Sequence, residues 1–316
     1  KKYKNRIAVI EENFNKKTYK QLISDSEFFN KNFLKKNVIL ILCDNNYESI
    51  AGYLGLLRNK SIPYLIDNSL NKFEVNNLLS KYKINYIYLP KKRVKEFKNY
   101  KKFLDFFQYC LIKTNNYFPY MIFNDLALLL STSGSVGNPK CVRLSKKNII
   151  SNSQSIIKFL NINKSDRVIT TLNPSYSYGL SIINTHLLSG ATLVLTKLTF
   201  FDKFFWKLLN KANVNTFGGV PFHYQILKKI KFENFDISSL KYITHAGGLI
   251  QQDTKNYILK VCKLKKIKFI SMYGATEATA RMSYIPWNFK NKSANCIGKA
   301  IPGGKFWIEN KKKLTK

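Results

Sequence analysis

The segment Ser131–Lys140 carries residue types that bind a phosphate group. Its candidate ligands are Thr132, Ser133, Gly134, Ser135, Gly137 and Lys140. The glycines let backbone N–H groups close around an anion, the hydroxyls add donors, and the lysine adds positive charge. The segment is not a Walker A loop, because the glycine spacing differs and a proline precedes the lysine. An ordinary Ser/Gly surface loop is the alternative, but this order of residues favours a phosphate cradle.

Two later segments carry groups suited to a nucleotide and a metal ion. The first contains Ala246, Gly247 and Gly248, whose paired glycines leave room for a flat ring against the backbone. The second runs Met272, Tyr273, Gly274, Ala275, Thr276, Glu277. It offers a ring for stacking, a hydroxyl for a phosphate oxygen and a carboxylate for Mg²⁺. Taken singly, Gly-Gly indicates a turn and Glu277 a helix N-terminal carboxylate. The combination favours a site.

Each of these segments directly follows a predicted strand. Apolar runs predict strands at Leu126–Leu130, Tyr242–Thr244 and Lys268–Ser271. Upstream, strands and helices alternate with short connections, which indicates a parallel sheet with covered faces. The upstream elements are strands at Val38–Cys43, Ile62–Ile66 and Asn85–Leu89, and helices at Tyr47–Arg58 and from a Ser69 cap to Lys81. Ligands bind at the carboxyl ends of strands in such folds, so the three segments are expected to converge.

The remaining patterns predict further elements of an α/β fold. A helix is predicted over Lys146–Leu160, with strands at Arg167–Leu172 and Thr192–Thr196. The basic stretch Lys91–Lys102 predicts a solvated helix. Beyond Tyr284 the sequence has prolines, a Gly-Gly turn and no helical pattern, which indicates the start of a β-rich subdomain.

The charge is strongly positive: 53 Lys and Arg against 18 Asp and Glu give +35. Such a field attracts polyanions, including nucleic acid. The basic residues are mostly dispersed lysines among abundant Asn, Ile and Tyr, as in an AT-rich coding sequence, and no RRM, zinc-finger or helix-turn-helix pattern accompanies them. We therefore expect no nucleic-acid partner, and keep a basic nucleic-acid-binding protein as the alternative.

Compartment signals are weak in this sequence. No apolar run approaches the ~20 residues needed to cross a bilayer, so no membrane span is expected. The start lacks the apolar core of a signal peptide. The five cysteines are odd in number and contain no C-x-x-C pair. These features indicate a cytoplasmic protein with reduced thiols.

The ordered set of motifs closely resembles the superfamily of AMP-forming adenylating enzymes. The resemblance rests on Thr132–Lys140 and Tyr273–Glu277, the signature pair of acyl-CoA synthetases, peptide-synthetase adenylation domains and luciferases. It extends to Tyr176–Leu180 with Leu188–Ala191, Val220-Pro221, Ala246–Gly248 and Ile297–Gly303. The motifs cover about Val38 to Gly303.

This resemblance implies a fold of two parallel-sheet α/β subdomains with helices on both faces, followed by the start of a β-barrel subdomain. The first subdomain would span residues 38–160, the second 1–37 with 161–284, and the incomplete β-rich part 285–316. In this superfamily an Asp for the ribose, a hinge and a C-terminal lid with a catalytic Lys follow Gly303. We expect the lid domain to be absent from these 316 residues, which alone would bind ATP weakly and adenylate slowly or not at all.

The resemblance also implies roles for individual residues. Thr132–Lys140 would cover the β- and γ-phosphates of ATP, with Lys140 catalytic. Gly247, Gly248 and Tyr273 would hold adenine, Thr276 would contact the α-phosphate, and Glu277 would bind Mg²⁺. The implied substrate positions are Tyr176, Ser177, Tyr178, Gly179 and Arg281. The family usually has Thr where this chain has Val136, so one phosphate-facing hydroxyl is lost, and it usually has Gly where this chain has Cys141.

The implied reaction joins a small carboxylic acid to AMP with release of pyrophosphate, then passes the acyl group to a thiol. Coenzyme A and the phosphopantetheine arm of an acidic acyl carrier protein are both candidate acceptors. A regulatory pseudo-enzyme on the same scaffold remains an alternative. Amino-acid-activating members place an Asp where this chain has Ser177, so we expect no standard α-amino acid as substrate. Arg281 would favour a hydroxylated or second-carboxylate-bearing acid, with a surface or interdomain arginine as the alternative.

Overall fold

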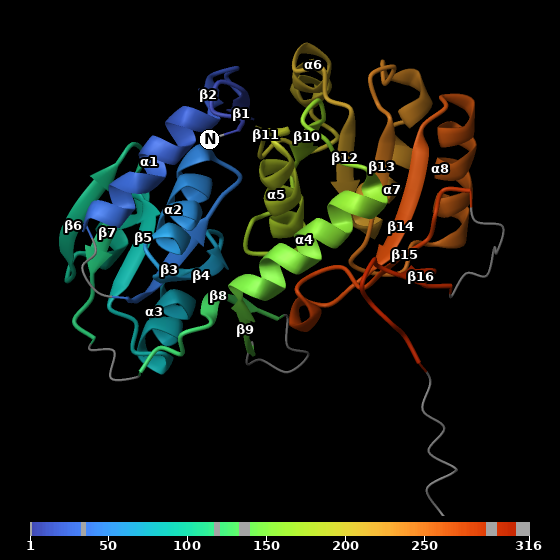
Figure 1. Ribbon diagram of the computed structural model, residues 1–316. Coiled ribbons are helices and arrows are strands. Elements are labelled where there is room, and N and C mark those ends of the chain that lie inside the picture. Colours follow the sequence, from blue (N-terminus) through green and yellow to red (C-terminus); the bar gives the residue numbers. More distant parts are fainter. Residues whose placement is uncertain (1, 33–35, 117–120, 133–139, 289–295, 308–316) are drawn as a thin grey trace, which may run out of the picture.

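The computed structural model describes residues 2–32, 36–116, 121–132, 140–288 and 296–307 (Figure 1). Its strands form two sheets that lie next to each other with helices between and outside them. No helix in these residues combines the length and the apolar content needed to span a membrane.

The first sheet has seven strands in the order β6-β7-β5-β3-β4-β8-β9. Their bounds are β3 (Val38–Cys43), β4 (Ile62–Asp67), β5 (Tyr86–Pro90), β6 (Lys101–Phe106), β7 (Tyr109–Lys113), β8 (Leu126–Ser131) and β9 (Cys141–Ser145). The central strands β5, β3, β4 and β8 are parallel, and the outer strands are antiparallel. Every residue of β3 is buried, as expected for a parallel strand covered on both faces.

The helices of the first half are α1 (Tyr19–Asn32), α2 (Tyr47–Arg58) and α3 (Lys72–Lys81). Asn46 caps α2 by accepting a hydrogen bond from the Ser49 amide at 3.0 Å. Asn71, not the predicted Ser69, caps α3, because it forms a reciprocal capping box with Glu74. α1 packs along α2, so the first 37 residues contribute to both halves, and the domain division stays a prediction.

The basic stretch 91–102 is not the solvated helix that its lysines suggest. It forms the 3₁₀ helix η1 (Lys91–Phe97) and then enters β6 at Lys101. Phe97 is buried, and the Arg93 guanidinium donates to the Asn68 carbonyl at 2.6 Å and to both Glu96 oxygens. The prediction fails because it weighed the many lysines and overlooked Arg93 and Phe97, the two residues that fix the segment to the rest of the subdomain.

The second sheet has nine strands in the order β16-β15-β14-β13-β12-β10-β11-β1-β2. Their bounds are β1 (Ile7–Ile10), β2 (Lys16–Thr18), β10 (Arg167–Thr170), β11 (Thr192–Leu195), β12 (Thr216–Gly219), β13 (Tyr242–His245), β14 (Lys268–Tyr273), β15 (Ser283–Tyr284) and β16 (Lys299–Ala300). The strands from β1 to β14 in this order are parallel. β15 and β16 extend the edge of this sheet, and the described residues contain no closed barrel.

The helices of the second half are α4 (Lys146–Leu160), α5 (Ser177–Ser189), α6 (Lys203–Lys211), α7 (Pro221–Lys229) and α8 (Gln252–Leu264), with short 3₁₀ turns η2 (Phe232–Asn234) and η3 (Thr276–Ala278). One core cluster joins α1, α2, α4 and α5 to the inner faces of both sheets. A second lies between the outer face of the second sheet and α6, α7 and α8, and a third covers the outer face of the first sheet. The result is a five-layer αβαβα arrangement (Figure 1).

Candidate active site

Three parallel strands of the second sheet end side by side. Gly219 of β12 pairs with His245 of β13, which in turn pairs with Ser271 of β14. The loops after these strands therefore start from one edge of the sheet, the edge at which open α/β sheets bind ligands. Loops 246–248 and 274–280 hold the residues predicted to contact adenine and the α-phosphate, apart from Met272 and Tyr273 at the end of β14.

A cavity of about 320 Å³ lies between these two loops. Its walls include Gly247, Gly248, Met272, Tyr273 and Gly274. Gly247 and Gly248 have φ angles of 87° and 151°, which residues with a side chain rarely adopt. A Cβ at Gly247 would also overlap the Tyr176 hydroxyl. The site therefore needs bare backbone here, and that backbone forms a flat wall beside the half-exposed ring of Tyr273.

The loop 274–280 is tightly folded on itself. The Ala275 carbonyl accepts hydrogen bonds from the amides of Ala278 and Ala280, both at 3.1 Å. Thr279 and Ala280 have φ angles of 70° and 129°, unfavourable values for residues with a Cβ. A Cβ at Gly274 would overlap the Ala280 carbonyl oxygen, so only glycine allows the turn. Strain concentrated in one loop is typical of a functional site.

Helix α5 points its N-terminus at this loop. Tyr176 is the N-cap residue and is partly exposed, whereas Ser177 and Tyr178 are buried. The Thr276 hydroxyl donates to Ser177 Oγ at 3.1 Å, which joins loop 274–280 to the first turn of α5. A Cβ at Gly179 would lie 2.5 Å from the Asn173 carbonyl oxygen, so this glycine lets the helix pack against the preceding loop. Positive charge from the helix end favours an anion between these elements.

Tyr178, in the first turn of α5, faces the second sheet. Its hydroxyl lies 2.8 Å from Thr244 Oγ1 and donates to the Thr244 carbonyl at 2.9 Å. Burial raises the pKa of Tyr178 to about 12, so the hydroxyl remains protonated at neutral pH. A Cβ at Gly218 would lie 2.7 Å from this hydroxyl, so the tyrosine fills the space that a side chain on β12 would need.

The structure describes only the two ends of the predicted phosphate loop, Thr132 and Lys140. Ser133, Gly134, Ser135 and Gly137 lie outside the described residues. The two ends of the loop are close, because the Thr132 amide donates to the Lys140 carbonyl at 3.0 Å. β9, which begins at Cys141, contacts η3, so the base of this loop lies near Thr276 and Glu277.

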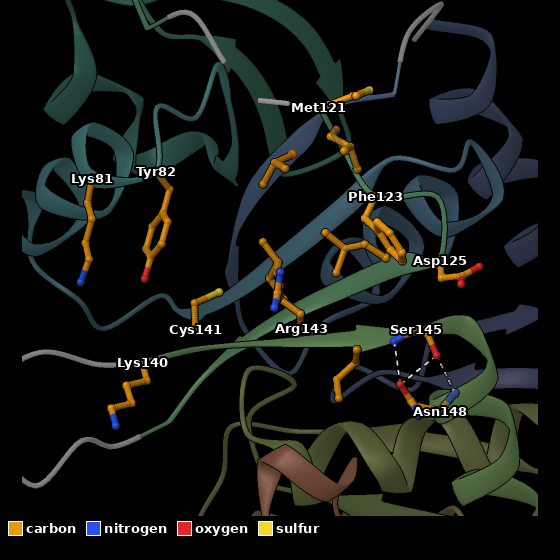
Figure 2. Close-up of a pocket in the computed structure, with 15 residues that line it drawn as sticks. Lys81, Tyr82, Met121, Phe123, Asp125, Lys140, Cys141, Arg143, Ser145 and Asn148 are labelled. Carbon is orange, nitrogen blue, oxygen red and sulfur yellow. Dashed lines mark hydrogen bonds between the residues drawn. The ribbon is translucent and has the colours of Figure 1, made fainter. Parts of the chain in front are cut away.

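Lys140 and Cys141 also border a second hollow of about 1110 Å³ on the first sheet. Figure 2 shows them at one end of it and the Ser145–Asn148 cap of α4 at the other. Burial raises the pKa of the Cys141 thiol to about 11, so it remains protonated and unreactive at neutral pH. None of the residues of loops 246–248 and 274–280 lines this hollow.

Arg281 is buried rather than on the surface, with 2% of its area exposed. Its Nε donates to Ser181 Oγ at 3.2 Å, and Nη1 lies 3.4 Å from Met272 Sδ. The guanidinium carbon lies 5.0 Å from the centre of the Tyr178 ring. Its backbone carbonyl accepts a hydrogen bond from Asn152 of α4 at 2.8 Å. Burial lowers the pKa of the guanidinium from its usual value, but an arginine remains charged at neutral pH.

All three histidines belong to the second half and are shielded from water. Burial lowers the pKa of His186, His223 and His245 to about 4 each, so all are neutral at pH 7. His245 Nδ1 lies 3.2 Å from Ser271 Oγ at the edge that carries the cavity. The histidines do not form a metal site: the described residues contain no group of three or more His, Cys, Asp or Glu able to hold a metal ion.

Glu277 alone fits the predicted magnesium role. Its side chain is exposed, and the described residues show no ion pair to it. Magnesium in nucleotide sites usually takes one or two carboxylates and completes its shell with phosphate oxygens and water. A single exposed carboxylate in a loop that contacts the N-terminus of α5 would therefore suit Mg²⁺ that arrives with ATP.

A family model described as AMP-binding enzyme matches residues 1–314. The chain belongs to this family. Among curated relatives, the medium-chain fatty-acid–CoA ligase of Escherichia coli is 27% identical over 157 residues, which is 49% of this chain and 27% of that ligase. The indoleacetate–CoA ligase of Aromatoleum aromaticum is 25% identical over 177 residues, 55% of this chain and 34% of that protein. The aligned region thus spans about a third or less of these relatives.

Solved structures share the fold of this chain. The N-terminal domain of FACL13 from Mycobacterium tuberculosis, bound to an inhibitor, has a TM-score of 0.79 at 16% identity and covers 95% of this chain and 79% of that one. The o-succinylbenzoate coenzyme A synthetase MenE from Bacillus subtilis, in complex with AMP, has a TM-score of 0.77 at 20% identity, covering 95% and 62%. The predicted α/β fold with two parallel-containing sheets is confirmed, and the start of a β-barrel subdomain stays a prediction.

The structure brings several of the predicted site residues together. Gly247, Gly248 and residues 272–274 line one cavity, and Thr276 is hydrogen-bonded to Ser177. Sequence reasoning missed Ser181 and Asn152, which fix Arg281 from α5 and α4. The four-residue spacing from Ser177 to Ser181 was a usable signal, because residues i and i+4 share one face of a helix.

Proposed function

We propose that this chain forms the nucleotide and acid site of an enzyme that uses ATP to activate a small carboxylic acid. The observation that carries the proposal is the junction of loop 274–280 with the N-terminus of α5 at Thr276 and Ser177, beside a cavity walled by bare glycine backbone. That arrangement offers a flat slot for a base and, next to it, an end that favours an anion.

In this proposal each group has a defined task. Adenine lies against Ala246–Gly248 and stacks on Tyr273. Thr276 donates to the α-phosphate, and Glu277 ligates Mg²⁺, which would neutralise charge on the phosphate oxygens. Thr132–Lys140 closes over the β- and γ-phosphates. Tyr176 borders the acid where it meets the α-phosphate, since its hydroxyl already lies against Gly247.

The chemical step is attack by a substrate carboxylate oxygen on the α-phosphorus, with pyrophosphate as the leaving group. Holding the two anions in line and offsetting their charge would supply most of the rate enhancement. The acyl-adenylate would then pass its acyl group to a thiol, either coenzyme A or a phosphopantetheine arm on an acidic carrier protein. The basic surface of the chain suits both acceptors.

The test is ATP/pyrophosphate exchange by the complete gene product against a panel of carboxylic acids, together with AMP binding by the 316-residue chain. We expect exchange that requires both an acid and Mg²⁺, with proteinogenic α-amino acids among the poorest substrates because Ser177 offers no charge to an ammonium group. Binding of neither ATP nor AMP by either protein would refute the proposed function.

A further inference from the structure

Arg281 presents a charge that the protein itself does not balance. The guanidinium is buried in the layer between the two sheets, and the described residues place no Asp or Glu in an ion pair with it. A guanidinium carries five N–H donors, and the only acceptors that the described residues offer them are Ser181 Oγ and Met272 Sδ. Buried charges and donors are normally paired, because water cannot reach them.

The neighbours of Arg281 are also incompletely paired. His186 Nδ1 lies 2.8 Å from the Ile182 carbonyl and therefore donates to it, while Nε2 is buried and has no hydrogen-bond partner in the described part of the chain. The Arg281 charge reaches this ring, since it contributes to lowering the pKa of His186. The Tyr178 ring covers one face of the guanidinium without supplying negative charge.

The position of Arg281 relative to the proposed reaction centre follows from α5. Thr276, the proposed α-phosphate contact, is hydrogen-bonded to Ser177, and Arg281 is hydrogen-bonded to Ser181 on the same helix face. Four residues of α-helix rise about 6 Å. The guanidinium therefore lies about one helical turn deeper than the place where the activated carboxylate would meet the α-phosphate.

We propose that Arg281 receives a second carboxylate, so that the substrate is a short dicarboxylic acid with one carboxylate at Thr276 and the other at Arg281. With carbon–carbon bonds of about 1.5 Å, a diacid of about four to six carbons spans the interval. A carboxylate accepts two parallel hydrogen bonds from a guanidinium and supplies the missing negative charge. This inference rests on the proposed function, because it assigns the far end of the acid in that same site.

The first experiment measures acid binding to the 316-residue chain in the presence of AMP by titration calorimetry. Succinate and butyrate form one matched pair, and glutarate and valerate another, since the members of each pair differ only in the second carboxylate. We expect each diacid to bind about 10- to 100-fold more tightly than its partner, the usual range for hydrogen bonds to a charged group. Equal affinities, or tighter binding of 4-hydroxybutyrate than of succinate, would overturn the assignment.

Variants at Arg281 distinguish a residue that binds the second carboxylate from one that only supports the fold. Arg281→Met should remove most of the preference for diacids and leave monoacid affinity within about threefold, whereas Arg281→Lys should keep part of the preference. Without ligand, Arg281→Met should melt no lower than the parent, because it removes a buried charge that lacks a counter-ion. An unchanged diacid preference in Arg281→Met, or a lower melting temperature that persists with no change in selectivity, would assign the residue a structural role.

Arg58→Met is the matched control for general charge effects. Arg58 is paired with Glu27 on the exposed surface of the first half, at 2.7 Å. Its loss should leave diacid and monoacid binding unchanged; a diacid preference that falls equally in Arg58→Met would reflect the positive surface and contradict the Arg281 assignment. AMP binding with no diacid preference refutes this inference alone, whereas a chain that binds neither AMP nor any acid refutes the proposed function as well.

Discussion

The carboxyl ends of the strands differ sharply between the two sheets. In the first sheet the end of β3 is occupied by the protein itself, whereas β8 leads into the predicted phosphate loop. The Cys43 carbonyl accepts hydrogen bonds from Asn68 and Asn173, and Asp44 forms an ion pair with Lys197 at 2.6 Å. In the second sheet the ends of β13 and β14 open into loops with bare glycines, positive φ angles and a cavity. The hydrogen-bonded end of β3 joins the two halves, whereas the strained ends of β13 and β14 beside a cavity mark the proposed site.

The largest effect should come from adding one carbon to the strained loop. In Gly274→Ala the new Cβ would overlap the Ala280 carbonyl oxygen, so loop 274–280 must move away from Ser177. A displacement of about 1 Å at a reacting group can cost on the order of 10²-fold in rate, so we expect ATP/pyrophosphate exchange by the complete gene product to fall by about that much. AMP affinity should fall as well, because the same loop borders the cavity. Equilibrium dialysis with labelled AMP measures it.

Gly52→Ala is the matched control in the first half. Its Cβ would lie 2.5 Å from Tyr88 Cε1, so overpacking should cost about 1–3 kcal/mol of stability while AMP affinity per folded molecule stays the same. If the two glycine variants lost AMP binding to the same extent, the strand ends of the second sheet would have no special role.

Removing the charge of Glu277 should rank next. Glu277→Gln keeps the size of the side chain but weakens its hold on Mg²⁺, so ATP/pyrophosphate exchange by the complete gene product should fall on the order of 10²-fold. Binding of AMP without metal should be unchanged, as should the circular dichroism spectrum. Glu27→Gln on the first half should show normal exchange, and equal losses in both variants would contradict the metal role.

Acid sensitivity should also belong to the second half, which contains all three histidines. His186 has a pKa of about 4 when folded and 6.5 as its ordinary value. The unfolded chain therefore takes up a proton first as pH falls, and the free energy of unfolding drops between pH 6.5 and about 4. Above this window the titration of His186 has no effect on stability, and below it the loss is complete and does not grow further. Urea titrations across this range should show about 1.4 kcal/mol per pH unit from this residue, and His186→Asn should remove that share of the slope. An unchanged slope in the variant would contradict the burial argument.

The smallest effect should come from the ion pair that joins the halves. The Lys197 side chain is 51% exposed, so its bond to Asp44 is screened by water. We expect Lys197→Met to cost no more than about 1 kcal/mol in denaturant unfolding and to leave AMP affinity unchanged. A larger loss, or weaker AMP binding, would show that the two halves depend on each other more than their strand ends indicate.

Much of the fold was predictable because its strands are fully buried and its helices are amphipathic. The bounds predicted for Val38–Cys43, Tyr47–Arg58 and Lys146–Leu160 match β3, α2 and α4. Strands at or next to the sheet edges escaped prediction. The edge strand β6 is mostly exposed and rich in lysine, the edge strand β9 has one buried residue, and β1, which pairs with the edge strand β2, has four residues and no alternation of buried and exposed positions.

Part of the candidate site could also be predicted from the sequence, and part could not. The resemblance pointed to Gly247, Gly248, Tyr273 and Thr276. The first three line one cavity, and Thr276 is hydrogen-bonded to Ser177. The burial of Arg281 could not be predicted, because its partners Ser181 and Met272 lie 100 and 9 residues away and the strained turn at Ala280 decides which way it points. The roles of Lys140 and of residues 133–137 stay predictions.

The most direct measurement is amide hydrogen exchange in the 316-residue chain with and without saturating AMP. If the open strand ends of the second sheet hold the nucleotide, exchange should slow at residues 246–250 and 272–277 and stay the same at residues 43–46 and 67–70. Protection of the first-sheet ends instead, or no change at either edge, would contradict the central claim.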